Sequence, residues 1–508
     1  MADETKFLGP LLGGIREDVE PFLIPLNAAV KVENFDLSGK YLKKSYGISS
    51  LGSSLASIPL GIVQFTTFDG ILHTVVVTED DILAWDGVTS GWVSIMSTTW
   101  ACTFSTLPSF ACINNVLLMT NHTNVIQVWD GNTATASDVS GSPAYYPRML
   151  DTFKDHVLLI GGAEGATERP QRIRWPAVGT YDGFSTPGNG YFDLLDTPGA
   201  ILAGKKFAQF YVVYKTDSVS VMQYIGGTSI FTANTIVSGT GIIAEKALLE
   251  VTGTHWFLGS DGGGYLDIFE FSGTNVLKRV GAPVGDLLKK VQRDYMARSF
   301  AVKYGSKCCF AVPIDSEYPD TWLVYDEENK NWSTEKRTAV CASLYLHTQV
   351  LTIGSLLGTI GDLQGLIGDL GLFAKSPQIL LGDLDKVIYC CDAQYTQVRG
   401  GSIESIYESG DIIFLDSKGN WETYRLRGFD FYCRGAGSLE LQYSLDNGET
   451  WLLPVTASQT VESSRQWLKF DIDVLTNIVR FKLTHTGGSI QIQGGNIRRL
   501  PEVVVSGA

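Results

Sequence analysis

Charged residues are scarce in this chain of 508 residues, and so are prolines and histidines. Charged side chains make up 18% of the sequence, which contains 17 prolines and six histidines. The histidines are isolated, and none has the paired spacing that is typical of a metal site. No residues in the sequence suggest a nucleophile, a base and an orienting third group. We therefore expect a protein that is not an enzyme, with no catalytic residue, cofactor or metal ligand to assign.

Long apolar runs and paired cysteine motifs are also lacking. Residues 338–361 carry no formal charge, but His347, Gly354 and Gly358 interrupt their apolar character, so we expect buried strands and no membrane insertion. The first residues include acids and no long apolar stretch, which argues against a secretory signal. The cysteines lack CxxC spacing and are expected to be reduced and buried, in a protein made in a cytoplasm. They are Cys102, Cys112, Cys308, Cys309, Cys341, Cys390, Cys391 and Cys433.

Basic residues are outnumbered by acidic ones. Lys and Arg total 39 and Asp and Glu total 54, which gives a net charge of −15. A protein with such a net charge is expected to be soluble and to repel nucleic acid at long range. A protein that grips DNA by neutralising phosphates is therefore disfavoured.

A phrase of an aromatic residue followed by Asp-Gly recurs along the chain. Its clearest copies are Trp85-Asp86-Gly87, Trp129-Asp130-Gly131 and Tyr181-Asp182-Gly183, and degenerate copies lie at 224–227, 271–273 and 325–327. Asp-Gly between apolar runs is a hairpin signal. The copies stand 44 to 54 residues apart, which suits a four-stranded propeller blade of about 40–50 residues. The sequence therefore predicts an all-β protein built on a β-propeller. Strands near 61–75 and 338–352 leave the blade count open between six and seven.

Four regions of the sequence differ in composition and in the pattern of apolar and polar residues. We expect an N-terminal extended arm (1–60), the β-propeller (61–345), an Ile-Gly-Asp-Leu repeat excursion that is a docking or platform segment (346–400), and an appended C-terminal β-sandwich (401–508). Alternating apolar and polar residues after position 400 predict the half-buried strands of the sandwich. Within the propeller, residues 284–296 predict a short amphipathic helix packed on the rim.

One motif in the sandwich region resembles the Asp box of sialidase-like proteins. Ser444, Asp446, Gly448, Thr450 and Trp451 match its pattern SxDxGxTW. In those proteins the box is a turn that stabilises a hairpin and is not catalytic. A glycan-binding or glycan-degrading propeller stays open as an alternative, because of this box and the 11 tryptophans.

Several blocks, taken in order, resemble the tail hub proteins of short-tailed bacteriophages (podoviruses), also called tail nozzle or packaged-DNA stabilisation proteins. The blocks include Pro170–Trp175, Phe192–Gly199, Tyr211–Met222, His255–Asp261 and Tyr318–Asp326. The Ile-Gly-Asp-Leu repeats and the ending Gly495-Asn-Ile-Arg-Arg are similar to the same group. The resemblance covers most of the chain after residue 20. Some members of the family carry a much longer nozzle insertion. This chain departs from those members in its shorter length.

The resemblance implies a virion structural protein of the phage tail that is assembled in the host cytoplasm. Six copies would form a homohexameric ring below the portal and its adaptor, with tail fibres or spikes docked outside. Viral DNA would be retained and then pass along the axis without sequence-specific binding. A receptor-binding tail fibre component is a further alternative, and it would more often be trimeric.

Overall fold

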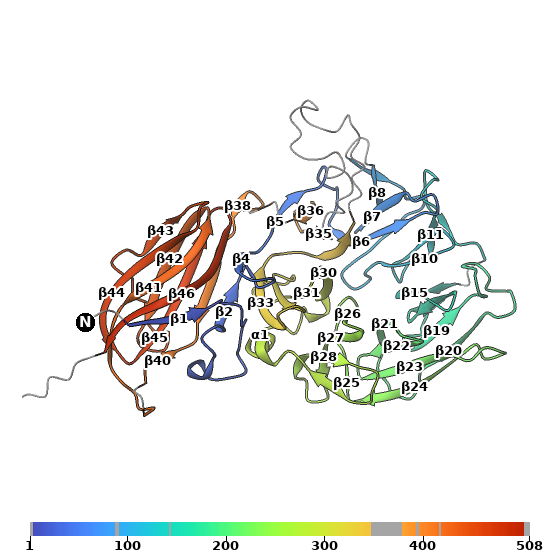
Figure 1. Ribbon diagram of the computed structural model, residues 1–508. Helices are drawn as coiled ribbons and strands as arrows, with labels where there is room; N and C mark the ends of the chain where they lie inside the picture. The colour runs from blue at the N-terminus through green and yellow to red at the C-terminus, as the bar shows by residue number, and fades with distance from the viewer. Residues whose placement is uncertain are drawn as a thin grey trace, which may run out of the picture.

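The computed structural model describes residues 4–86, 91–141, 144–346, 378–392, 395, 397–415 and 418–501. These residues form a β-propeller with an appended C-terminal β-sandwich, as the sequence predicts. Figure 1 shows the sandwich on the left, the propeller on the right, and strands β2 (Ala29–Glu33) and β4 (Leu42–Lys44) between them.

Seven blades can be traced through the described residues. In each blade four antiparallel strands run from an inner strand outward, and in the fifth blade the inner strand is split in two. The first four blades consist of β6 (Pro59–Thr66), β7 (Leu72–Thr78), β8 (Ile82–Asp86) and β9 (Gly91–Ser94); β10 (Ser109–Ile113), β11 (Val116–Thr120), β12 (Gln127–Trp129) and β13 (Ser137–Asp138); β15 (Met149–Phe153), β16 (His156–Ile160), β19 (Arg172–Trp175) and β20 (Gly190–Asp193); and β21 (Ile201–Phe207), β22 (Phe210–Lys215), β23 (Ser218–Tyr224) and β24 (Phe231–Ser238). The last three consist of β25 (Thr240–Ile242) with β26 (Leu248–Val251), β27 (Thr254–Asp261), β28 (Leu266–Phe271) and β29 (Leu277–Arg279); β30 (Phe300–Tyr304), β31 (Lys307–Val312), β32 (Thr321–Asp326) and β33 (Asn331–Lys336); and β34 (Cys341–Tyr345), β35 (Gln378–Gly382), β36 (Ile388–Asp392) and β5 (Gly47–Ser50).

The N-terminal region closes the ring. Strand β5 is the outer strand of the seventh blade and pairs with β36, while β34 of the same blade contacts β6 of the first. The six aromatic-Asp-Gly phrases all fall between the third and fourth strands of their blades. The seventh blade has no such hairpin, because its fourth strand comes from the other end of the chain. This explains why six phrases accompany seven blades.

The sandwich is made of two sheets, and N-terminal strands enter both. One sheet contains β1 (Glu4–Gly9), β3 (Phe35–Asp36), β4 (Leu42–Lys44), β41 (Tyr424–Gly435), β44 (Gln466–Thr476) and β46 (Ile490–Pro501). The other contains β2 (Ala29–Glu33), β39 (Ser405–Ser409), β40 (Ile412–Ile413), β42 (Gly437–Ser444), β43 (Ser458–Val461) and β45 (Ile478–Thr486). The core between the two sheets is aromatic. The ring centroids of Phe429 and Phe431 lie 5.3 and 5.5 Å from that of Phe481.

Short elements fill the remaining connections. They are β14 (Tyr145–Tyr146), β17 (Ala163–Glu164), β18 (Thr167–Glu168), β37 (Gln397–Val398) and β38 (Gly401–Ser402), with the 3-10 turns η1 (Pro21–Leu23), η2 (Ala282–Val284) and η3 (Met296–Arg298). The helix predicted over 284–296 is shorter than expected, since α1 spans only Gly285–Lys289. The chain leaves the helix because the N–H of Gln292 donates to the carbonyl of Pro313, in the sixth blade.

Two predicted domain boundaries need correction. Residues 1–60 are not a separate arm, because their strands complete the seventh blade and both sandwich sheets. The propeller does not end at residue 345, because β35 and β36 also belong to it. The predicted excursion 346–400 thus overlaps the seventh blade, and its Ile-Gly-Asp-Leu repeats lie outside the described residues.

Candidate functional site at the propeller–sandwich junction

One continuous sheet joins the propeller to the sandwich. Strand β2 lies parallel to β33 of the sixth blade through Glu33 and Thr334, and antiparallel to β39 of the sandwich. The resulting sheet has ten strands and runs from β30 to β43. A hydrophobic cluster follows the same path, from Trp332 through Tyr407 to Phe481. The two domains therefore share backbone hydrogen bonds and a core, which makes their connection stiff.

Asn34 lies at the centre of this junction. Its backbone has a φ of 56°, a left-handed conformation that asparagine tolerates better than most residues. Its amide nitrogen donates to the carbonyl of Glu404 at 2.7 Å, and its amide oxygen accepts from the N–H of Lys336 at 2.8 Å. Its backbone N–H donates to Thr334 and its carbonyl accepts from Ser45. Asn34 thus links the sixth blade, the N-terminal strands and the sandwich.

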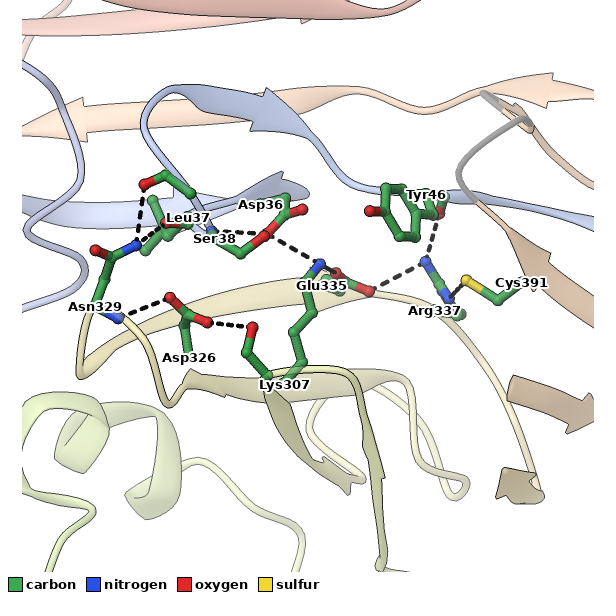
Figure 2. Close-up of polar contacts among 12 residues, drawn as sticks. Asp36, Leu37, Ser38, Tyr46, Lys307, Asp326, Asn329, Glu335, Arg337 and Cys391 are labelled. Carbon is green, nitrogen blue, oxygen red and sulfur yellow. Dashed lines mark hydrogen bonds and ion pairs between the residues drawn. The ribbon is translucent and has the colours of Figure 1, made fainter. Parts of the chain in front are cut away.

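A buried group of charged residues lies at the same junction (Figure 2). The ammonium of Lys307 is 3.2 Å from Asp36 and 3.7 Å from Glu335, and the guanidinium of Arg337 is 3.1 Å from Glu335. All four side chains are at most 6% exposed. We call these four residues the junction charge cluster.

The junction charge cluster also reaches the strands that close the ring. Arg337 donates to the carbonyl of Tyr46 at 2.7 Å and to the Sγ of Cys391 at 3.0 Å. Tyr46 immediately precedes β5, and Cys391 lies in β36, its partner strand. The cluster therefore connects the sixth blade, the seventh blade and the N-terminal strands. Because its atoms are buried, it can hold these elements together but cannot reach a substrate.

The electrostatics favour the charged forms of this cluster. Burial lowers the pKa of Lys307, but the carboxylates of Asp36 and Glu335 outweigh burial and leave the pKa raised. Burial likewise raises the pKa of Asp36, but Lys307 and the hydrogen bond from Ser38 outweigh it and leave the pKa lowered. Buried charges persist only when they are paired in this way. Removing one member would leave its partners as buried charges with neither a counter-ion nor water around them.

The inner strands β10, β15, β21 and β26 line a pocket of about 280 Å³. Its lining includes Asp151, Lys205, Glu245 and Lys246, so both signs of charge are present. Tyr211 donates to Asp151 at 2.8 Å, and Arg148 pairs with Glu245 at 2.6 Å. Asp151 and Glu245 therefore each have a partner beside the pocket.

The Asp box forms a turn that follows β42. Asp446 accepts hydrogen bonds from the backbone N–H of Thr450 at 2.8 Å and from the hydroxyls of Thr450 and Ser444 at 2.6 and 2.7 Å. These bonds, that of the Thr450 hydroxyl first, lower the pKa of Asp446 to about 2. Three hydrogen bonds thus tie the carboxylate to the turn, as the sequence interpretation expects.

The cysteines are free thiols, and most of them are buried. Burial raises the pKa of Cys102 to about 11 and that of Cys433 to about 12. In the part of the chain that the structure describes, no group of three or more His, Cys, Asp or Glu residues could hold a metal ion. In the same part, no helix is both long and apolar enough to cross a membrane.

Sequence reasoning did not single out Asn34 or the junction charge cluster. A signal was present at Lys307, because this lysine directly precedes the fully buried run Cys308–Val312. A charged residue that opens such a run indicates a buried ion pair. The partners could not be found in this way, because Asp36 is far from Lys307 in the sequence.

The architecture defines a class, a seven-bladed propeller whose sixth blade continues into a β-sandwich. No protein-family model and no curated protein matches the sequence. Solved structures with a similar shape include YCF48 from Cyanidioschyzon merolae (12% identity, TM-score 0.38, covering 68% of this chain and 98% of that chain). They also include BamB from Moraxella catarrhalis (11%, 0.36, 71% and 94%) and the extracellular domain of the putative one-component system BT4673 from B. thetaiotaomicron (13%, 0.42, 80% and 47%). Likeness at this level of identity concerns the fold alone.

Proposed function

We propose that this protein is a structural subunit of a short-tailed bacteriophage tail, the hub or nozzle ring. In this proposal six copies assemble below the portal and adaptor, retain the packaged genome and line part of its exit path. Fibres or spikes and other tail proteins dock on the outside. The work of such a subunit is mechanical, since it must hold its shape while DNA under pressure is retained and then released.

The observation that carries the proposal is the ten-stranded sheet that runs from the sixth blade into the sandwich. Domains joined by a flexible linker move relative to one another by default. Here the backbone pairing of β2 with both β33 and β39 opposes such movement. A stiff two-domain body is what a ring subunit needs in order to keep a fixed angle to its neighbours.

The segments that resemble tail hub proteins support the proposal by their place in the fold. Pro170–Trp175 contains β19, Tyr211–Met222 spans parts of β22 and β23, His255–Asp261 lies in β27, and Tyr318–Asp326 contains β32. The resemblance thus follows the third to the sixth blade, the body of the propeller. It is not confined to one turn or loop.

In this proposal the DNA passage lies between copies, on the ring axis. Six chains of net charge −15 would total −90, and an acidic lumen would let a polyanion slide without binding.

Two measurements test the proposal. Native mass spectrometry of the purified protein, alone and with tail partners, is expected to show six copies, whereas three copies would favour a tail fibre component. Electron microscopy of phage particles with a tag at the C-terminus should place the label at the tail below the portal. A monomer that degrades a glycan, or a strongly basic lumen in the assembled ring, would contradict the proposal.

A further inference from the structure

We infer that neighbouring copies of this chain join through a knob on the first blade and a pocket at the fifth blade. The knob is the turn Thr67–Ile71, and Phe68 at its tip would enter the pocket of the next copy. The inference rests on the proposed ring, because it names the contact that would build it.

The knob presents an apolar side chain and a carboxylate on a well-ordered turn. Phe68 is 86% exposed and Ile71 is 49% exposed. The N–H of Gly70 donates to the carbonyl of Thr67 at 2.9 Å, and the hydroxyl of Thr67 bonds to Asp69. The N–H of Phe68 donates to Asn115 in the second blade. The turn is thus held in one shape before any partner arrives, which lowers the entropic cost of binding.

The pocket lies between the β27–β28 turn and the connection from the fifth to the sixth blade. Its volume is about 510 Å³, within the range of about 300–1,000 Å³ that is usual for binding pockets. Apolar side chains line it, namely Leu266, Leu288, Val291 and Met296. Tyr265 lies at its rim and is 70% exposed.

Three basic residues, Arg279, Lys289 and Arg293, and one carboxylate, Asp267, line the same pocket. Arg279 pairs with Asp261 and Lys289 with Asp286. Arg293 has no hydrogen-bond or ion-pair partner within the described residues, and its guanidinium lies over Gly264. A cation without a partner beside an apolar pocket favours a ligand with an apolar group next to an acid.

The knob matches the pocket in both respects. Phe68 supplies an aromatic ring that can fill the apolar cavity and pack against Tyr265. Asp69, the next residue, supplies a carboxylate for Arg293. The hydrogen bond from Thr67 lowers the pKa of Asp69, so the carboxylate is charged at neutral pH. The complementarity of the two surfaces commits the inference to a second copy of this chain as the occupant.

The positions of knob and pocket exclude a contact within one copy. The knob connects the first and second strands of its blade, whereas the pocket is bounded by the turn between the second and third strands of the fifth blade. Alternation of strand direction places these turns on opposite faces of the propeller. A contact between two different surfaces is heterologous, and such contacts generate rings when the rotation closes.

A charge exchange tests the contact in the full-length protein. By native mass spectrometry across a concentration series, Phe68→Ser is expected to weaken association at least ~30-fold, the usual scale of an aromatic hot spot. Asp69→Arg and Arg293→Glu should each weaken association, and the double variant should recover it, because the pair is restored with its signs reversed. Val276→Ser, which removes another exposed apolar side chain (68% exposed), should associate like the unaltered protein.

The outcomes separate this inference from the proposed function. A hexamer that persists in Phe68→Ser, or single charge variants whose loss is not recovered in the double variant, would overturn the contact and leave the hub proposal standing. A trimer that dissociates in Phe68→Ser would support the contact and contradict the hub. An unaltered protein that stays monomeric at every concentration would overturn both.

Discussion

The side-chain amide oxygen of Asn34 accepts a hydrogen bond from the backbone N–H of Lys336 at 2.8 Å. The amide nitrogen of the same side chain donates to Glu404, 2.7 Å away. Lys336 ends the outer strand of the sixth blade, and Glu404 precedes the first strand of the sandwich after residue 400. A single side chain therefore bonds to both domains, and its removal should destabilise both.

Substituting Asn34 should separate the backbone and side-chain contributions to the junction. Asn34→Ala removes two partly buried hydrogen bonds and places alanine at a φ of 56°. We expect a loss of about 3 kcal/mol in the free energy of unfolding, from unpaired backbone groups and the left-handed conformation. Asn34→Gly tolerates this φ and should lose about 1 kcal/mol less. Denaturant unfolding followed by tryptophan fluorescence measures both, and equal losses would contradict a role for the backbone conformation.

Removing the ammonium of Lys307 should be costly. Lys307→Ala leaves Asp36 and Glu335 buried without their cation, and such a loss typically costs about 3–5 kcal/mol. The control is Arg425→Ala, which removes an exposed ion pair with Asp473; exposed pairs contribute about 0–1 kcal/mol. Thermal unfolding of the two variants should therefore differ clearly. A similar change in both would mean that the junction charge cluster adds little stability.

The free energy of unfolding should fall on acidification because His255 is buried in its neutral form. Burial lowers the pKa of His255 to about 4, from a usual value of 6.5. The folded state thus binds its proton less readily than the unfolded state, so the stabilisation is complete above pH 6.5 and is lost as the pH falls towards 4. The shift corresponds to about 3 kcal/mol. His255→Phe should reduce the fall in melting temperature between pH 6.5 and 4, and an unchanged fall would assign it to other groups.

Closure of the propeller by β5 should depend on Gly47. A Cβ at this position would lie 2.4 Å from the carbonyl oxygen of Gln397 and 2.6 Å from its nitrogen. Gly47→Ala should therefore displace β5 and speed hydrogen exchange in β36, its partner strand. Gly285→Ala is the control, since a Cβ there meets nothing within 4 Å. Equal exchange in β36 for both variants would show that β5 does not depend on this close contact.

Much of the propeller could be predicted from the sequence because its signals are local. At Asp130 the carboxylate accepts from the N–H groups of Asn132 and Thr133, at 2.9 and 2.8 Å, within one turn. Such turn chemistry depends only on neighbouring residues. The alternation in β44, where every second residue from Leu468 to Ile472 is buried, is equally local. The class of fold followed from these two patterns.

Pairings between distant segments could not be predicted in this way. Residues 47–50 pair with 389–392, and Glu33 pairs with Thr334. Neither pairing has a turn or a period that marks it, and the N-terminal residues were therefore interpreted as an arm. The same limit applies to Asp36 and Lys307, which become an ion pair only when β3 lies against the sixth blade.

The sequence by itself determined that hairpins of similar size would follow one another and that a sandwich would end the chain. It also determined the turns, because hydrogen bonds within four or five residues fix their conformation. Only the tertiary structure decided that the ring has seven blades, that its last strand comes from the N-terminal region, and that one sheet joins both domains. The physical reason is that strand partners hundreds of residues apart are selected by the burial and hydrogen bonding of the whole fold, which no short segment encodes.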